Sequence, residues 1–125
     1  MSYNSNVTYS EFMSTSRITT HILDTTCGRP AIGVSVRLEV QGPHGWLGIG
    51  SGVSNEDGRI MNLGPAELAV GNYRIEIDTG AYYQRIETES FFSSVCLSFT
   101  LKDPAQHYHV PLLLSPFAIS TYRGS

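Results

Sequence analysis

The sequence predicts an all-β fold: a two-sheet antiparallel sandwich of about eight short strands with one short helix. Two observations predict it. Apolar and polar residues alternate in several separate segments, the pattern of strands with one buried face. Glycine, proline and Asn/Asp clusters separate these segments at intervals of about ten residues, as in sandwiches with short connections. The chain has 125 residues and 41% hydrophobic residues, which suits one domain with one core.

The N-terminal half contains four expected strands. Residues 17–24 alternate and are rich in β-branched side chains. Residues 34–40 show the most regular alternation, with valine or leucine at every second position. Residues 46–53 have glycine at every second position, which leaves one strand face bare and indicates a bulge or close packing. Residues 59–63 form a short strand after the Asn-Glu-Asp-Gly turn at 55–58.

The C-terminal half predicts a helix among further strands. Residues 73–78 and 95–101 alternate as strands, and residues 81–87 are the only plausible helix. The stretch from 107 to 114 is expected to be a strand, followed by a Ser-Pro turn and a last strand at 117–122.

Cysteine usage favours two reduced thiols of an intracellular protein over a disulfide. Cys27 lies in an expected loop, residues 25–32, and Cys96 lies within an expected strand. Residues 1–16 are rich in Ser, Asn and Thr and are expected to be a flexible leader rather than a signal peptide, with the domain at 17–125. The C-terminal Arg-Gly-Ser is not the peroxisomal Ser-Lys-Leu address. We therefore expect a cytoplasmic protein, with the peroxisome left open.

Composition also excludes some partners. No run approaches the roughly 18 apolar residues of a membrane span, so no membrane association is expected. The formal net charge is −3, Lys102 is the only lysine, and the arginines are scattered, so there is no basic patch for nucleic acid.

Three histidines are candidates for catalysis or metal binding. His107 and His109 share one strand face, and His21 lies on a separate strand. Together they could bind zinc, but no carboxylate or cysteine follows at a supporting interval, so we expect no metal and no cofactor. On their own, Arg59 and Arg123 are typical of solvated surface charges. Gly50-Ser51-Gly52 does not match the Gly-x-Ser-x-Gly elbow of serine hydrolases.

Three segments carry a family resemblance. They are Thr19-Thr20-His21-Ile22-Leu23-Asp24-Thr25 with Gly28-Arg29-Pro30-Ala31, then Asn55-Glu56-Asp57-Gly58-Arg59, and then residues 107–116 with the terminal Tyr122-Arg123-Gly124-Ser125. Together they resemble the signatures of the 5-hydroxyisourate hydrolases of the transthyretin-like protein family, from residue 17 to the end of the chain. The tail distinguishes these hydrolases from transthyretin hormone carriers. Ala118-Ile119 replaces the more common Gly-Tyr.

The resemblance implies a fold, an assembly and a reaction. The expected fold is the transthyretin-like sandwich, and the expected assembly is a homotetramer, a dimer of dimers facing each other across a channel. The reaction is hydrolysis of 5-hydroxyisourate to 2-oxo-4-hydroxy-4-carboxy-5-ureidoimidazoline in urate (purine) catabolism, without a cofactor. The resemblance assigns catalysis to His21, Arg59 and His109. It assigns substrate binding to His21, Arg59, Tyr122, Arg123, Gly124 and Ser125.

Two other classes of function remain open at this point. One is a transthyretin-like, non-catalytic binding protein for a small aromatic ligand. A passive apolar channel gains nothing from burying ionisable groups, so the set of His21, Arg59 and His109 argues against it. The other is a metal-dependent hydrolase that uses the three histidines.

Overall fold

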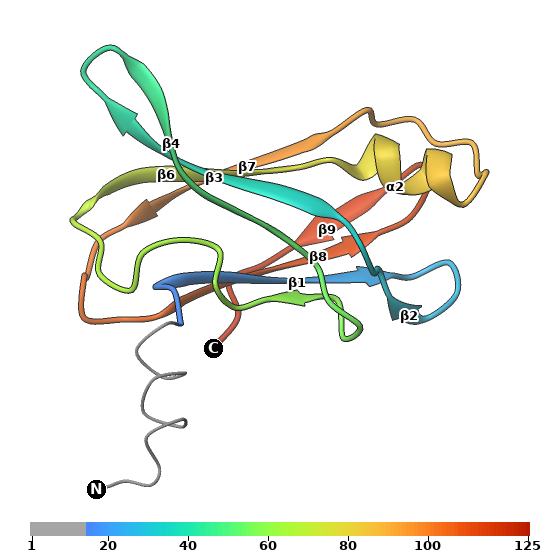
Figure 1. The fold of residues 1–125 in the computed structure, drawn as a ribbon, viewed down its shortest axis with the longest axis horizontal. Coiled ribbons are helices and arrows are strands. Elements are labelled where there is room, and N and C mark those ends of the chain that lie inside the picture. The colour runs from blue at the N-terminus through green and yellow to red at the C-terminus, as the bar shows by residue number, and fades with distance from the viewer. Residues whose placement is uncertain (1–14) are drawn as a thin grey trace, which may run out of the picture.

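The structure, a computed structural model, describes residues 15–125, in which two β-sheets pack face to face (Figure 1). The expected leader, residues 1–16, thus lies outside the described residues apart from Thr15 and Ser16. The described elements are β1 (Ile18–Asp24), β2 (Arg29–Pro30), β3 (Ser35–Gly42), β4 (Gly45–Val53), β5 (Arg59–Ile60), β6 (Gly71–Ile77), α2 (Thr79–Arg85), β7 (Val95–Leu101), β8 (Tyr108–Leu114) and β9 (Ile119–Thr121).

The sheet topology confirms the two-sheet sandwich. The first sheet has the order β2-β1-β8-β9, with β5 also paired to β1, and the second has the order β4-β3-β6-β7. One pairing differs from the antiparallel expectation: β1 and β8 run parallel, from Ile18↔Tyr108 to Asp24↔Leu114. Most of the domain lies between these two strands in sequence, and such a long connection allows parallel pairing.

The core lies between the two sheets and follows the predicted alternation. Ile18 and Ile22 of β1, Leu38 of β3, Ile75 of β6 and Leu112 of β8 have no exposed surface. The alternate residues of β1 and β8 point out of the sandwich, because successive strand side chains face opposite sides. Thr19, His21, His107 and His109 therefore share one outward surface, which we call the histidine face.

Element boundaries differ from the predicted ones for local reasons. The helix begins at Thr79 rather than residue 81, because the Asp78 carboxylate accepts a hydrogen bond from Ala81 N (3.1 Å) and caps it. The short strand β2 lies within the expected loop at 25–32, where it pairs with the end of β1. Strand β5 covers only the first two of the residues expected at 59–63.

The bare glycine face of β4 reflects close packing, as predicted. A Cβ atom at Gly50 would lie 2.0 Å from the Leu63 carbonyl oxygen, and one at Gly52 would lie 2.6 Å from the Ile60 side chain. Leu38 and Glu39 also flank an irregularity in the β3–β4 register. No helix within residues 15–125 is long and apolar enough to cross a membrane.

Candidate active site

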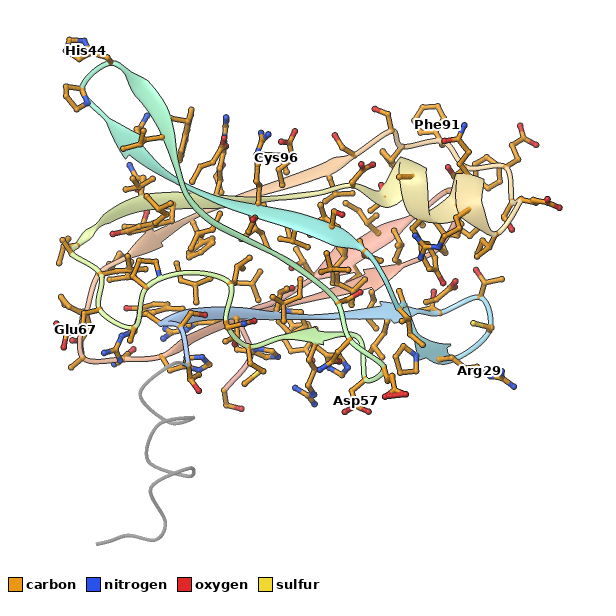
Figure 2. The ribbon with its side chains drawn as sticks, in the orientation of Figure 1. Arg29, His44, Asp57, Glu67, Phe91 and Cys96 are labelled. Carbon is orange, nitrogen blue, oxygen red and sulfur yellow. The ribbon has the colours of Figure 1, made fainter. Side chains whose placement is uncertain are left out.

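The register of the first sheet brings the three candidate catalytic residues together. Strand β1 lies between β5 and β8, and His21 pairs in register with Arg59, while Thr19 pairs with His109. The ring centroids of His21 and His109 are 6.5 Å apart. Three segments that are distant in sequence thus contribute one side chain each. His44 is exposed at the tip of the projecting β3–β4 hairpin, on the opposite side of the molecule from Asp57 (Figure 2).

The turn before β5 fixes the position of Arg59. Gly58 has a φ of +76°, and a Cβ atom there would lie 2.4 Å from the Ile22 carbonyl oxygen, so only glycine fits. The Ile22 amide donates to the Gly58 carbonyl (2.7 Å), which ties the turn to β1. The Asn55 side-chain oxygen accepts hydrogen bonds from the Asp57 and Arg59 amides at 2.9 and 3.0 Å. This part of the expected middle motif therefore holds the Arg59 backbone beside His21.

The Arg59 guanidinium is exposed and, among the described residues, has no hydrogen-bond or ion-pair partner. Its charge nevertheless acts on the neighbouring imidazoles, because it lowers the pKa of both His21 and His109. A cation without a carboxylate partner is available to a ligand that carries negative charge.

Burial is the main cause that lowers the pKa of all three histidines on this face below 6.5. For His21 the Arg59 charge adds to this effect, while a hydrogen bond with the Asp57 backbone and the Asp57 carboxylate oppose it. For His109 the charges of Arg59, His107 and His21 all contribute in the same direction as burial. The imidazoles are therefore neutral near pH 7, the protonation state in which a histidine can accept a proton.

Thr19 is a site residue whose role the sequence did not indicate. It is fully buried, and its hydroxyl oxygen lies 2.8 Å from His109 Nδ1 and 3.1 Å from His107 Nε2. The rings of His107 and His109 are stacked, with centroids 6.4 Å apart. The sequence offers one indication of this role: Thr19 lies two residues before His21 and therefore shares its strand face.

The C-terminal tail divides between two sides of β8. Gly124 forms a bridge with His109, donating its amide hydrogen to the His109 carbonyl (2.8 Å). A Cβ atom at Gly124 would lie 2.8 Å from His109 Cδ2, so the tail backbone packs directly against the imidazole. Ser125 follows Gly124 at the end of the chain.

Arg123 is not brought to the histidines within this chain. Its guanidinium lies 4.4 Å from the centre of the Tyr108 ring and donates to Gln106 Oε1 (2.8 Å). Alternation along an extended segment puts Arg123 and Gly124 on opposite sides, which the residue order alone did not resolve. Tyr122 is 58% exposed and lines, with Arg123, a cavity of about 320 Å³ between the tail and β7.

Residues 18–124 match the family model described as the HIUase/Transthyretin family. The chain belongs to this family. A 5-hydroxyisourate hydrolase of Salmonella dublin is 42% identical over 109 residues, which cover 86% of this chain and 80% of that protein. The structure of Klebsiella pneumoniae 5-hydroxyisourate hydrolase matches with a TM-score of 0.77 and 38% identity, covering 86% of this chain and 98% of that chain.

Family membership and fold do not by themselves separate hydrolase from carrier. A sea bream transthyretin, solved in complex with thyroxine, matches with a TM-score of 0.80 and 32% identity, covering 86% of this chain and 94% of that chain. The two structural matches are thus about equally good. The choice between the two functions depends on the side chains of the histidine face.

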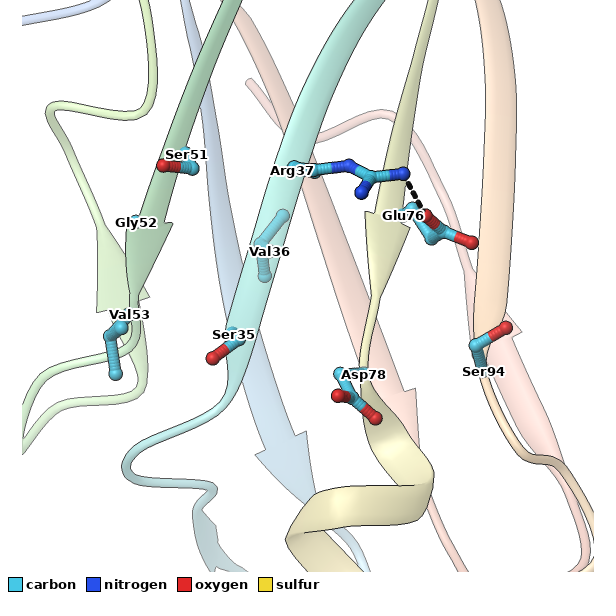
Figure 3. Close-up of a pocket in the computed structure, with 9 residues that line it drawn as sticks. All are labelled: Ser35, Val36, Arg37, Ser51, Gly52, Val53, Glu76, Asp78 and Ser94. Carbon is cyan, nitrogen blue, oxygen red and sulfur yellow. Dashed lines mark hydrogen bonds and ion pairs between the residues drawn. The ribbon is translucent and has the colours of Figure 1, made fainter. Parts of the chain in front are cut away.

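Other candidate features of this family member offer less chemistry. A hollow of about 450 Å³ on the outer face of the second sheet is lined by Arg37, Glu76, Asp78 and several serines (Figure 3). There Arg37 is paired with Glu76 at 2.6 Å, and the lining contains no histidine. In residues 15–125, no three side chains of His, Cys, Asp or Glu are grouped so that they could hold a metal ion.

Proposed function

We propose that this protein is a 5-hydroxyisourate hydrolase that adds water to 5-hydroxyisourate and opens its six-membered ring. The observation that carries the proposal is Arg59, a cation without an anionic partner among the described residues, held beside the neutral imidazoles of His21 and His109. The printed names of the Salmonella and Klebsiella relatives support the choice of substrate.

The reaction needs a base, a donor at the oxyanion and close positioning. One imidazole takes a proton from water, whose oxygen attacks the ring carbonyl next to the hydroxylated carbon. The carbonyl π electrons move to oxygen, and the Arg59 guanidinium stabilises the resulting negative charge. The C–N bond then breaks, its electron pair goes to the ring nitrogen, and the nitrogen takes back a proton. The carboxylic acid that is left releases its remaining proton to the solvent and becomes a carboxylate, and one water has been consumed. His21 and His109 are our candidates for the proton transfers.

The tail contributes a wall to this proposed pocket. Gly124 lies against the His109 ring, and Tyr122 and Ser125 are its neighbours along the chain. We assign Tyr122, Gly124 and Ser125, together with Arg123, to substrate binding, as the resemblance implies. Because Arg123 contacts Tyr108 and Gln106 in one chain, its part in binding requires a rearrangement or a second subunit.

The proposed assembly is a homotetramer, a dimer of dimers whose histidine faces line a shared channel. Strands β7 and β9 end their sheets, and an edge strand leaves backbone donors and acceptors open to pairing. Phe117 and Ile119, 61% and 37% exposed, add apolar surface near β9. Sedimentation at micromolar concentration should give a species of about four chains. A monomer that still hydrolyses the substrate would contradict the shared channel.

The experiment that tests the function is a spectroscopic decay assay. Urate oxidase generates 5-hydroxyisourate from urate, and added protein should accelerate the decay of its absorbance. Binding of the compound without faster decay would support the carrier instead. Loss of activity on incubation with a chelator, restored by zinc, would support the metal-dependent hydrolase.

A further inference from the structure

Thr19 occupies a position between two histidines that the proposed reaction has not yet used. The residue has no exposed surface, and its hydroxyl oxygen contacts His109 Nδ1 at 2.8 Å and His107 Nε2 at 3.1 Å. A buried hydroxyl is normally satisfied by protein partners, and these two ring nitrogens are the ones within reach. The hydroxyl therefore links the protonation states of the two rings.

Two arrangements give the Thr19 hydrogen an acceptor, because the hydrogen bonds of this hydroxyl within residues 15–125 go to the two rings alone. A hydroxyl has one hydrogen to donate, and a neutral imidazole has one N–H group and one bare nitrogen. If Thr19 donates to one ring, the other ring must donate to Thr19, because two acceptors facing each other would repel. The hydrogen bonds thus run either from His107 through Thr19 to His109 or in the reverse direction.

The two distances favour the direction that ends at His109. Hydroxyl donors make the shorter bonds, about 2.5–3.0 Å to oxygen acceptors, whereas N–H···O bonds commonly extend to about 3.2 Å. The 2.8 Å contact with His109 Nδ1 fits the Thr19 O–H group as donor, and the 3.1 Å contact fits a His107 Nε2–H group as donor. In the reverse direction the hydroxyl would have to donate across the longer distance.

The charges around the two rings keep both of them neutral, as this count requires. Burial and the Arg17 guanidinium lower the pKa of His107. Burial, Arg59 and the two neighbouring histidines lower the pKa of His109. A neutral His109 that accepts at Nδ1 carries its proton on Nε2, and no hydrogen bond within residues 15–125 uses that Nε2 atom.

We propose that Thr19 and His107 are positioning residues for the hydrolysis proposed above. They form a chain from His107 Nε2–H through the Thr19 hydroxyl to His109 Nδ1, which keeps the ring proton of His109 on Nε2. His109 then meets the substrate as a neutral hydrogen-bond donor. This inference rests on the proposed function, because the substrate gives the Nε2–H group its acceptor.

The hydrogen-bond chain also gives each of the two candidate catalytic histidines a different role. His109 Nε2–H donates to the substrate carbonyl and shares the developing oxyanion with Arg59, as a neutral imidazole can. His21 takes the proton of the attacking water and returns it to the departing ring nitrogen when the C–N bond breaks. The Asp57 backbone acts on the His21 pKa as a hydrogen-bond acceptor would, so we assign the His21 N–H group to that side and the bare nitrogen to the attacking water.

The direct test is the tautomer of His109 in the full-length protein near pH 7.5. Histidine labelled with ¹⁵N in both ring positions, observed through long-range proton–nitrogen correlations, reports which nitrogen carries the hydrogen. His109→Asn identifies its signals. We expect the proton on Nε2 in the wild type and a mixture of tautomers in Thr19→Val, which has a similar shape without the hydroxyl. A wild-type His109 that is protonated on Nδ1 would contradict the proposed hydrogen-bond chain.

The kinetic test uses the decay assay and a matched pair of variants. Thr19→Val should lower kcat about tenfold, the equivalent of one lost hydrogen bond, with little change in KM. Thr19→Ser keeps the hydroxyl and should recover most of the rate, and His107→Leu should resemble Thr19→Val. Wild-type kinetics in a folded Thr19→Val would also overturn the chain. Hydrolysis by a protein whose His109 proton lies on Nδ1 would contradict only the hydrogen-bond chain. The expected His109 tautomer in a protein that does not hydrolyse the compound would contradict the proposed function and, with it, the positioning role.

Discussion

The outer faces of the two sheets differ in whether their charged side chains are paired with each other. On the second sheet, Glu39 accepts from Arg74 Nε at 2.6 Å and from Arg37 Nη2 at 3.4 Å, and Arg37 also pairs with Glu76 at 2.6 Å. We call this set the paired-charge face. The Arg74 guanidinium also lies 4.3 Å from the centre of the Trp46 ring.

On the histidine face, by contrast, the Arg59 cation has no carboxylate partner among the described residues. Together with burial, which is the larger cause, its charge lowers the pKa of His21 and His109 and favours their neutral forms. A charge satisfied within the fold contributes to its stability, whereas an unsatisfied one is available to a ligand. The comparison therefore predicts that changes on the histidine face affect turnover and that changes on the paired-charge face affect stability.

The largest effect is expected from removing the tail. Deleting residues 122–125 should abolish hydrolysis and lower the melting temperature only slightly, because the tail forms a pocket wall, and the contacts that are lost, the Gly124 bridge to His109 and those of Arg123 with Tyr108 and Gln106, lie at the end of the chain. The decay assay and thermal melting measure the two outcomes. If the deletion variant keeps full activity, the tail has no part in catalysis, and the site consists of His21, Arg59 and His109 alone.

Two milder tail variants sharpen this prediction. Gly124→Ala inserts a Cβ atom 2.8 Å from His109 Cδ2 and should displace the imidazole, lowering kcat by about tenfold to a hundredfold. Gly48→Ala is a matched control, because nothing lies within 4 Å of its Cβ position. Tyr122→Phe should give a partial loss if the phenol hydroxyl contacts the substrate.

The next effect concerns the two candidate catalytic histidines. His21→Asn and His109→Asn should each lower kcat about a hundredfold or more, because each removes a group that moves or donates a proton. His44→Asn, at the tip of the β3–β4 hairpin, should leave the rate unchanged and serves as the control. Near-normal turnover in either of the first two variants would remove that residue from the mechanism.

Sequence patterns predicted the strands and the candidate catalytic residues, but not the contacts that the neighbouring side chains make. Alternation predicted the strands, and the motifs predicted that His21, Arg59 and His109 would meet. The link through Thr19 could not be foreseen, because it depends on β1 and β8 pairing in parallel with Thr19 opposite His109. The contacts of Arg123 with Tyr108 and Gln106 likewise arise from the tail's register rather than from its composition.

A smaller effect is expected in the pH dependence. The pKa of His21 is lowered from 6.5, so its neutral form persists to lower pH than that of a free imidazole. The rate should therefore be retained near pH 7 and fall only below pH 6.5, as the proton-accepting imidazole becomes charged. Arg59→Gln removes a cause of the lowering, so the midpoint should move upward. NMR titration of the ring signals measures it, and an unchanged midpoint would contradict the assigned electrostatics.

The central claim is that unpaired charge on the histidine face serves catalysis while the paired-charge face serves the fold. The most direct test measures kcat/KM for 5-hydroxyisourate and thermal stability in Arg59→Gln and Glu39→Gln side by side. Arg59→Gln should lower kcat/KM about a hundredfold or more with an unchanged melting temperature. Glu39→Gln should keep kcat/KM and lower the melting temperature slightly, because Arg74 loses its charged partner. Full activity in a folded Arg59→Gln, or lost activity in a folded Glu39→Gln, would contradict the claim.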